Sequence, residues 1–132
     1  MNAPSKDVRA MLEDDSTLDL TYGTNLFIGR EPAKVDECVI VFDTVGFPPQ
    51  LTLAGKGEDY FYPSIQIRVR NNKYTDGYDL IKNIMTSLHG RANETWNGTL
   101  YIVIYATSEP ALLDWDDNKR VSWIINFNLQ RR

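Results

Sequence analysis

Arg68 and Arg70 are the residues of this 132-residue chain whose type and spacing are most suggestive of binding chemistry. They lie in the segment from Ser64 to Arg70, where Gln66, Arg68 and Arg70 alternate with three apolar residues. This period of two predicts a strand with one face on the core and the other toward solvent or a partner. A row of guanidinium groups can hold an anion or pair bidentately with carboxylates of a neighbouring subunit. The alternative is a solvated strand face with scattered charge.

An acidic cluster near the C-terminus is a candidate partner for these arginines. The cluster consists of Asp114, Asp116 and Asp117. With Asn118 it resembles the first half of a calcium-binding loop, but the turn glycine and the final bidentate glutamate of such a loop are missing. We therefore interpret it as a solvated turn between two strands that is free to contact a second subunit. The residues predicted for a subunit interface are Gln66, Arg68, Arg70, Asp114, Asp116 and Asp117.

No set of residues predicts catalysis or a cofactor. The pair Gly55-Lys56 fails as a phosphate-binding loop, because Gln50 stands where the first glycine belongs and Gly57 where Ser or Thr belongs. One histidine, His89, and one cysteine, Cys38, are too few for a zinc site. His89 is predicted to cap the end of a helix, and Cys38 to be a buried structural thiol. We expect neither an enzyme nor a bound metal or cofactor.

The charge and hydropathy exclude some classes of partner. A net charge of −4, from 14 basic and 18 acidic residues, argues against broad electrostatic binding to nucleic acid. No apolar run approaches the ~20 residues of a membrane span, and the N-terminus lacks the apolar core of a signal peptide. We therefore expect a cytosolic protein with no membrane contact.

The order of the predicted helices and strands indicates one α+β domain over residues 1–132. It is expected to be a mostly antiparallel β-sheet with two helices packed on one face. The residues from Gln50 to Tyr60 are predicted to form a mobile loop, and Gly46 to Pro49 to end a strand. Strands near Tyr101 to Tyr105 and Trp123 to Phe127 are predicted to pair, joined by the acidic loop. The predicted helices are Ser5–Glu13 and Thr75–His89, the second ended by Gly90, and the predicted strands are Asn25–Gly29, Cys38–Thr44, Ser64–Arg70, Leu100–Tyr105 and Val121–Gln130.

Several stretches, in order, resemble a family of small structural proteins of long-tailed bacteriophages, described as tail terminator, minor capsid or head–tail joining proteins. They are Leu26–Pro32, Val41–Pro49, Tyr62–Arg70 with the helix to Leu88, and Arg120–Arg132. The resemblance implies a ring, commonly a hexamer, at the head-proximal end of the tail tube. Such a ring ends tube polymerisation and binds the head–tail connector protein. It also implies a location at the head–tail joint of the virion, and in the host cytoplasm during assembly.

The same resemblance implies the partners. They are further copies of the chain, the tail-tube protein and the connector, while DNA passes through the lumen without specific binding. A ring needs a heterologous interface whose rotation closes. The strands Cys38–Phe42 and Leu100–Tyr105, apolar on both faces, could supply it or could be covered central strands.

Two alternatives remain open at this point. Within the same class, the protein could be a neck or head-completion connector protein on the portal side. In a different class, it could be a small anion-binding module or enzyme that uses Arg68 and Arg70.

Overall fold

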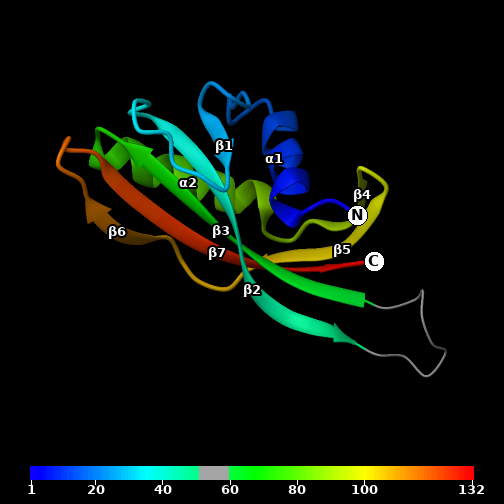
Figure 1. The fold of residues 1–132 in the computed structure, drawn as a ribbon. Helices are drawn as coiled ribbons and strands as arrows, with labels where there is room; N and C mark the ends of the chain where they lie inside the picture. The colour runs from blue at the N-terminus through cyan, green and yellow to red at the C-terminus, as the bar shows by residue number, and fades with distance from the viewer. Residues whose placement is uncertain (51–59) are drawn as a thin grey trace.

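A computed structural model describes residues 1–50 and 60–132 as one curved sheet with two helices against one face (Figure 1). The loop predicted between Gln50 and Tyr60 lies, apart from those two residues, outside the described part of the chain. The elements are α1 (Pro4–Asp14), β1 (Leu26–Ile28), β2 (Cys38–Gln50), β3 (Tyr60–Asn71), α2 (Tyr74–Leu88), β4 (Ala92–Trp96), β5 (Thr99–Ala106), β6 (Ala111–Trp115) and β7 (Val121–Arg131).

The sheet has the strand order β1-β2-β3-β7-β5-β4, and β6 also pairs with β7. All neighbours are antiparallel except β1 and β2, which are parallel, so the sheet is mixed. The predicted pairing of the strands near residues 101–105 and 121–130 is confirmed, with Tyr105 opposite Asn128. The predicted α+β class, with a mostly antiparallel sheet, is therefore confirmed.

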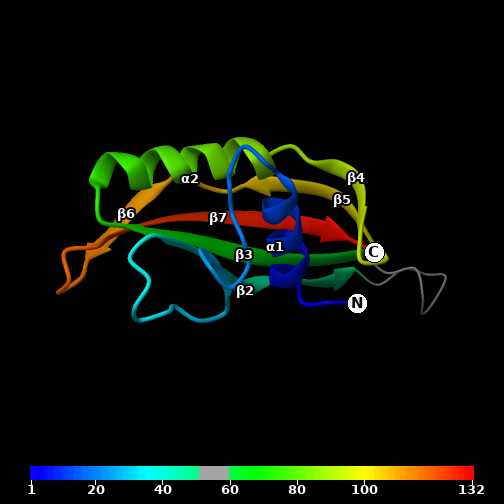
Figure 2. The ribbon, with the colours of Figure 1, turned by 90° about the horizontal axis from the view of Figure 1, so that it is seen from above.

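The alternation predicted for β3 sets the two faces of the sheet. Ile65, Ile67 and Val69 are fully buried and face the helices, together with the apolar side chains of β7. α2 runs along this face beside β7 and β3 (Figure 2). Fully buried apolar side chains each contribute roughly 1.5–3 kcal/mol, so this layer is the main source of stability.

The helix boundaries match the sequence prediction within one residue, but one cap differs. Gly90 follows α2 with φ 91°, the left-handed conformation predicted for it. The predicted helix begins at Ser5, whereas in the structure Ala3 occupies the N-cap position and Pro4 begins the helix. Ser5 instead donates its backbone N–H and its hydroxyl to the carboxylate of Asp43 in β2, at 2.9 and 2.7 Å. The carboxylate that stabilises the positive end of α1 is therefore that of Asp43 in β2, which is distant in the sequence.

The strand predictions fail at three places. β2 runs through Pro48 and Pro49 to Gln50, where we predicted an end, because this part lies at the sheet edge and its register shifts absorb the missing N–H groups. β4 and β6 lie in segments predicted as connections. β4 is polar, and all five residues of β6 are exposed, so neither shows the alternation that marks a half-buried strand.

A buried polar cluster links α1 to the β4–β5 turn, to β5 and to the end of β7. Asp7 is fully buried and accepts hydrogen bonds from Asn97 Nδ2 at 2.7 Å and from the hydroxyl of Tyr101. The guanidinium of Arg131 donates to Tyr101 Oη at 3.2 Å and to the carbonyl oxygen of Asn2 at 2.8 Å. The cluster joins the first helix, the β4–β5 turn and the end of β7, so α1 is held by charge as well as by its apolar face.

Alkaline pH is expected to destabilise the fold through Tyr101. Burial, reinforced by the hydrogen bond to Asp7, raises the pKa of Tyr101 above its usual value. The unfolded chain then releases this proton near pH 10 while the folded protein keeps it, so stability falls as pH rises through about 10. Urea unfolding between about pH 9 and 11 should show a smaller alkaline loss for Tyr101→Phe than for the parent. Equal losses in both proteins would contradict this assignment.

Candidate assembly surfaces

The face of the sheet opposite the helices carries a row of polar side chains, here called the open face: Ser64, Gln66, Arg68, Asn126 and Asn128. Ser64 Oγ donates to Asn128 Oδ1 at 2.6 Å, and Gln66 Nε2 donates to Asn126 Oδ1 at 3.2 Å. These pairs are cross-strand neighbours of β3 and β7, which is why their side chains meet. Arg68 is the only charged member of the open face.

Arg68 lies where the sequence places it, half-buried on the open face. Its Nε donates to Gln66 Oε1 at 3.1 Å, and its NH1 pairs with Glu31 Oε1 at 3.0 Å. The guanidinium also stacks over the ring of Phe42 in β2, 4.9 Å from the ring centre. Arg68 therefore leans toward the β2 side of the sheet.

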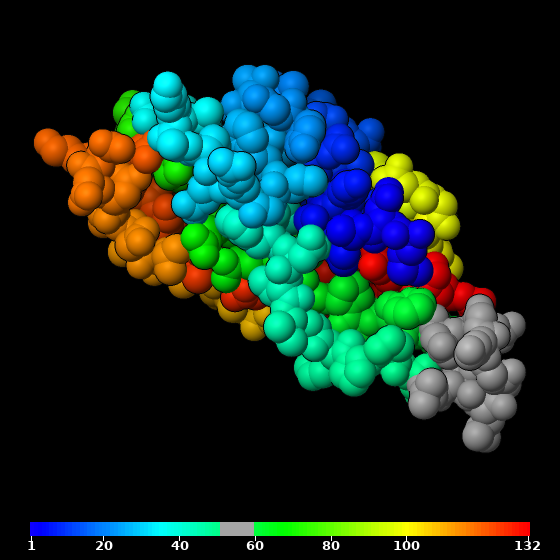
Figure 3. Space-filling model, in the orientation of Figure 1, coloured from blue at the N-terminus to red at the C-terminus, as the bar shows by residue number. Residues whose placement is uncertain are grey.

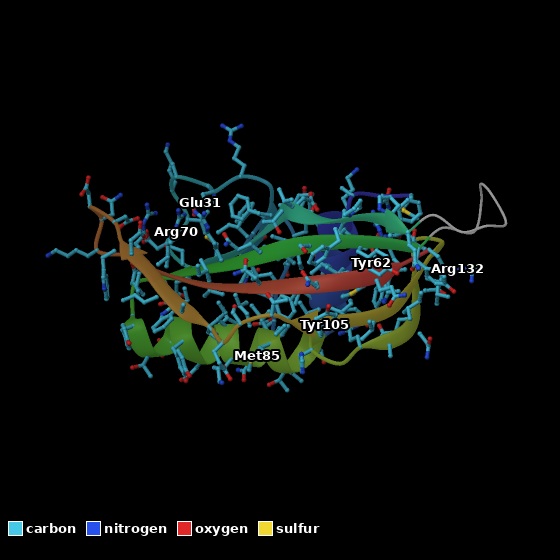
Figure 4. The ribbon with its side chains drawn as sticks, turned by 90° about the horizontal axis from the view of Figure 1, so that it is seen from below. Glu31, Tyr62, Arg70, Met85, Tyr105 and Arg132 are labelled. Carbon is cyan, nitrogen blue, oxygen red and sulfur yellow. The ribbon has the colours of Figure 1, made fainter. Side chains whose placement is uncertain are left out.

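Arg70 occupies a different environment from Arg68. It is only 5% exposed, and its guanidinium donates to the backbone carbonyls of Pro32 and Val35. Figure 4 shows Arg70 beside the connection that carries Glu31. These contacts are within one chain, so the expectation that Arg70 faces a neighbouring subunit does not fit its burial.

A second buried arginine, missed at the sequence level, holds the same connection. Arg120 is 6% exposed and donates to the carbonyl of Ala33 at 3.0 Å, to Asp116 Oδ2 at 2.7 Å and to Asp36 Oδ1 at 3.5 Å. Arg70 and Arg120 together bind three backbone carbonyl oxygens of residues 29–37, the connection between β1 and β2. No local sequence signal could reveal this, because Arg120 ends a polar turn and resembles any solvated charge.

The predicted acidic cluster is divided by the fold. Asp116 accepts the backbone N–H groups of Arg120 and Asn118 at 2.9 and 3.0 Å, and these bonds with the Arg120 guanidinium lower its pKa. Asp114 lies in β6, opposite Ser122 and therefore on the same side of the sheet as the open face. Asp114 and Asp117 are exposed. Among the described residues no ion pair joins these three carboxylates to Arg68 or Arg70.

Two parts of the sheet edge expose large apolar side chains. β6 exposes Leu112, Leu113 and Trp115, each by more than 40%. The end of β2 exposes Val45 by 97% and Phe47 by 68%. The two parts lie at opposite ends of the molecule in Figure 3, β6 in orange and the end of β2 in green-cyan. Each of these parts is paired on one side only, and exposed apolar side chains on such edge strands mark sites of association.

The strands predicted to be apolar on both faces differ in how they are covered. In β2, Cys38 and Ile40 are buried on the open-face side, and the pKa of the Cys38 thiol is raised by that burial. This agrees with a structural thiol. In β5, Tyr105 remains 42% exposed, so the strand is not covered on both sides.

The remaining candidates for chemistry have structural contacts. His89 follows α2, but its Nδ1 accepts the backbone N–H of Ala106 at 2.9 Å rather than capping helix carbonyls as predicted. Within residues 1–50 and 60–132, no group of three or more His, Cys, Asp or Glu side chains is arranged to hold a metal ion. Neither helix in this part of the chain is long and apolar enough to cross a membrane.

The described chain is a mixed sheet with helices on one face, and strands at its edges expose apolar side chains of the kind that mark sites of association. The chain belongs to the bacteriophage tail terminator protein family, whose pattern it matches over residues 15–132. Its fold is similar to that of a chain from the virion of a native gene transfer agent particle, with a TM-score of 0.68 and 12% identity over 98% of this chain and 94% of the other. No curated protein sequence matches it.

Family membership confirms the resemblance found in the sequence. As a member of this family, the protein is a structural, tail-related protein of a phage virion. Membership in a family of structural phage proteins points away from catalysis.

Proposed function

We propose that this protein is the tail terminator of a long-tailed phage and forms a ring, most simply a hexamer, at the head-proximal end of the tail tube. The ring ends polymerisation of the tube and joins the tail to the head–tail connector protein. The observation that carries this proposal is the family match over residues 15–132, nearly the whole described fold. The exposed apolar strands at two separate edges support it, since a closed ring needs two different contact surfaces on each copy.

The open face suits a surface past which DNA moves. Gln66, Asn126 and Asn128 are neutral and already hydrogen-bonded to their neighbours, while Arg68 is paired with Glu31. Proteins bind duplex DNA tightly through cations that contact the phosphates, and the one cation of this face, Arg68, is already paired with Glu31. The net charge of −4 on the whole chain agrees with a lumen through which DNA passes without specific binding.

The alternative of an anion-binding module that uses both arginines gains no support from the geometry. The guanidinium of Arg70 is buried and one of its nitrogens donates to two carbonyl oxygens, while the guanidinium of Arg68 bonds Glu31 and Gln66. A bidentate site would require both groups to leave these partners. The neck or head-completion role differs from the terminator role only in which partner the ring binds.

The purified protein is expected to form rings in solution or when mixed with the tail-tube protein. Native mass measurement should give six copies, and negative-stain images should show a closed ring. Pull-downs should retain both the tail-tube protein and the connector. A protein that stays monomeric even with tail-tube protein would overturn the proposal, and binding to the portal side alone would favour the neck role.

A further inference from the structure

Besides the outer edges of β1 and β4, which end the sheet, two further strand edges have no partner among the described residues, and they lie on opposite sides. On one side, β7 is shared between β5, which pairs with residues 127–131, and β6, which pairs with residues 121–124. The outer edge of β6 is unpaired. On the other side, β1 pairs only with Val39–Val41, so from Phe42 onward β2 is paired with β3 on its inner side and its outer edge has no described partner.

The strand directions allow these two edges to join. β6, β7, β3 and β2 are successive antiparallel neighbours, so β6 and β2 run in opposite directions within one sheet. If a second copy continues the sheet with the same orientation, its β2 lies antiparallel to the β6 of the first. Antiparallel pairing is the more stable arrangement per residue. The contact is heterologous, as ring closure requires.

We propose that β6 of one copy pairs with the segment Phe42–Phe47 of β2 in the next copy, so that the ring is held by a continuous sheet. This inference rests on the proposed ring. The lengths agree: β6 has five residues, and Pro48 and Pro49, which lack an N–H, limit the pairable part of β2 to the residues before them. The two edges are also offset along the strands, and such a stagger is needed to close tilted strands into a barrel.

The side chains at the joint are complementary. The exposed Val45 and Phe47 of one copy come next to Leu112, Leu113 and Trp115 of the other, so pairing removes apolar surface from water on both sides. This also covers two edges that would otherwise template aggregation.

The joint also brings an aspartate of one copy toward an arginine of the next. Asp114 lies opposite Ser122 and Arg68 lies opposite Ile124, so both side chains are on the open-face side. Arg68 leans over Phe42, the first residue of the free β2 segment. Across the joint, Asp114 of one copy therefore approaches Arg68 of the next.

Cross-linking between engineered cysteines tests the pairing. The variant Val45→Cys/Leu113→Cys, treated with a short thiol-reactive cross-linker, should give a ladder of covalent oligomers that ends at the closed ring. Each single variant should give no cross-link, and a mixture of the two should give dimers and nothing larger, because the contact is head to tail. Cys38 stays in every variant, since it is buried.

The matched control is Val45→Cys/Asp79→Cys, in which the second cysteine is on the exposed side of α2 and should give no ladder. Rings seen in images without a cross-link between positions 45 and 113 would overturn the strand pairing and leave the proposed function standing. Rings that are absent together with the cross-link would overturn both.

Discussion

Replacing Asp7 by alanine is expected to lower the free energy of unfolding by about 3–5 kcal/mol, the usual cost of removing one partner from a buried charged cluster. The carboxylate is fully buried and accepts hydrogen bonds from Asn97 and Tyr101, with Arg131 NH1 3.9 Å from Oδ2. Without it, the guanidinium of Arg131 loses its counter-charge and the Tyr101 hydroxyl its acceptor. Both are buried, so water replaces the lost contacts poorly. Urea unfolding followed by circular dichroism measures the loss.

Two variants on the same helix make this prediction specific. Asp14→Ala removes an exposed carboxylate at the negative end of α1 and should change stability by less than about 0.5 kcal/mol. Asp7→Asn keeps the size and one acceptor oxygen, so its loss should fall between the other two. If Asp7→Ala were no more harmful than Asp14→Ala, the cluster would contribute nothing to the attachment of α1.

The cluster shows why part of this fold could not be predicted from the sequence. Asp7 suits the first turn of a helix wherever it points, and nothing near it indicates burial. Its partners Asn97 and Tyr101 are 90 and 94 residues away. By contrast, α2 and β3 were predictable, because their apolar side chains repeat with the period of a helix and of a half-buried strand.

The candidate assembly surfaces also contain parts that could be predicted from the sequence and parts that could not. The period of β3 correctly places Gln66 and Arg68 on the face opposite the core, half-buried beside β7. It places Arg70 on that face too, but it carries no information about the connection of residues 29–37, which folds over the end of the strand. β6 was missed because it is exposed on every residue and depends on the edge of β7 for its pairing. β6, which carries one of the two exposed apolar surfaces, therefore lacks the alternating pattern by which a strand is predicted.

Replacing Arg70 by alanine is expected to destabilise the monomer by about 3 kcal/mol, whereas charge reversal at Arg68 should act on assembly. Hydrogen bonds to a charged group each contribute roughly 1.5–3 kcal/mol, and Arg70 makes two, to the carbonyls of Pro32 and Val35. Their loss frees the connection of residues 29–37, which lies against the thiol of Cys38 through the carbonyl of Val35. Arg70→Lys should recover part of the loss, because one ammonium reaches the two carbonyls less well than a planar fork. Urea unfolding of the monomer measures both variants.

Arg68→Glu is the matched comparison, two residues along the same strand. Its side chain is 32% exposed, and its pair with Glu31 is a surface contact of at most about 1 kcal/mol, so the monomer should stay folded. Ring formation should weaken by about tenfold, and Asp114→Arg should weaken it similarly, since either change places like charges across the proposed joint. Combining the two reverses both charges and should restore assembly, a rescue that a purely internal role for Arg68 does not produce. Restored ring formation in the double variant would show that Arg68 acts in assembly. An Arg70→Ala variant that loses stability but still forms the ring would show that Arg70 acts in folding. If Arg70→Ala instead kept its stability and lost the ring, these roles would be reversed.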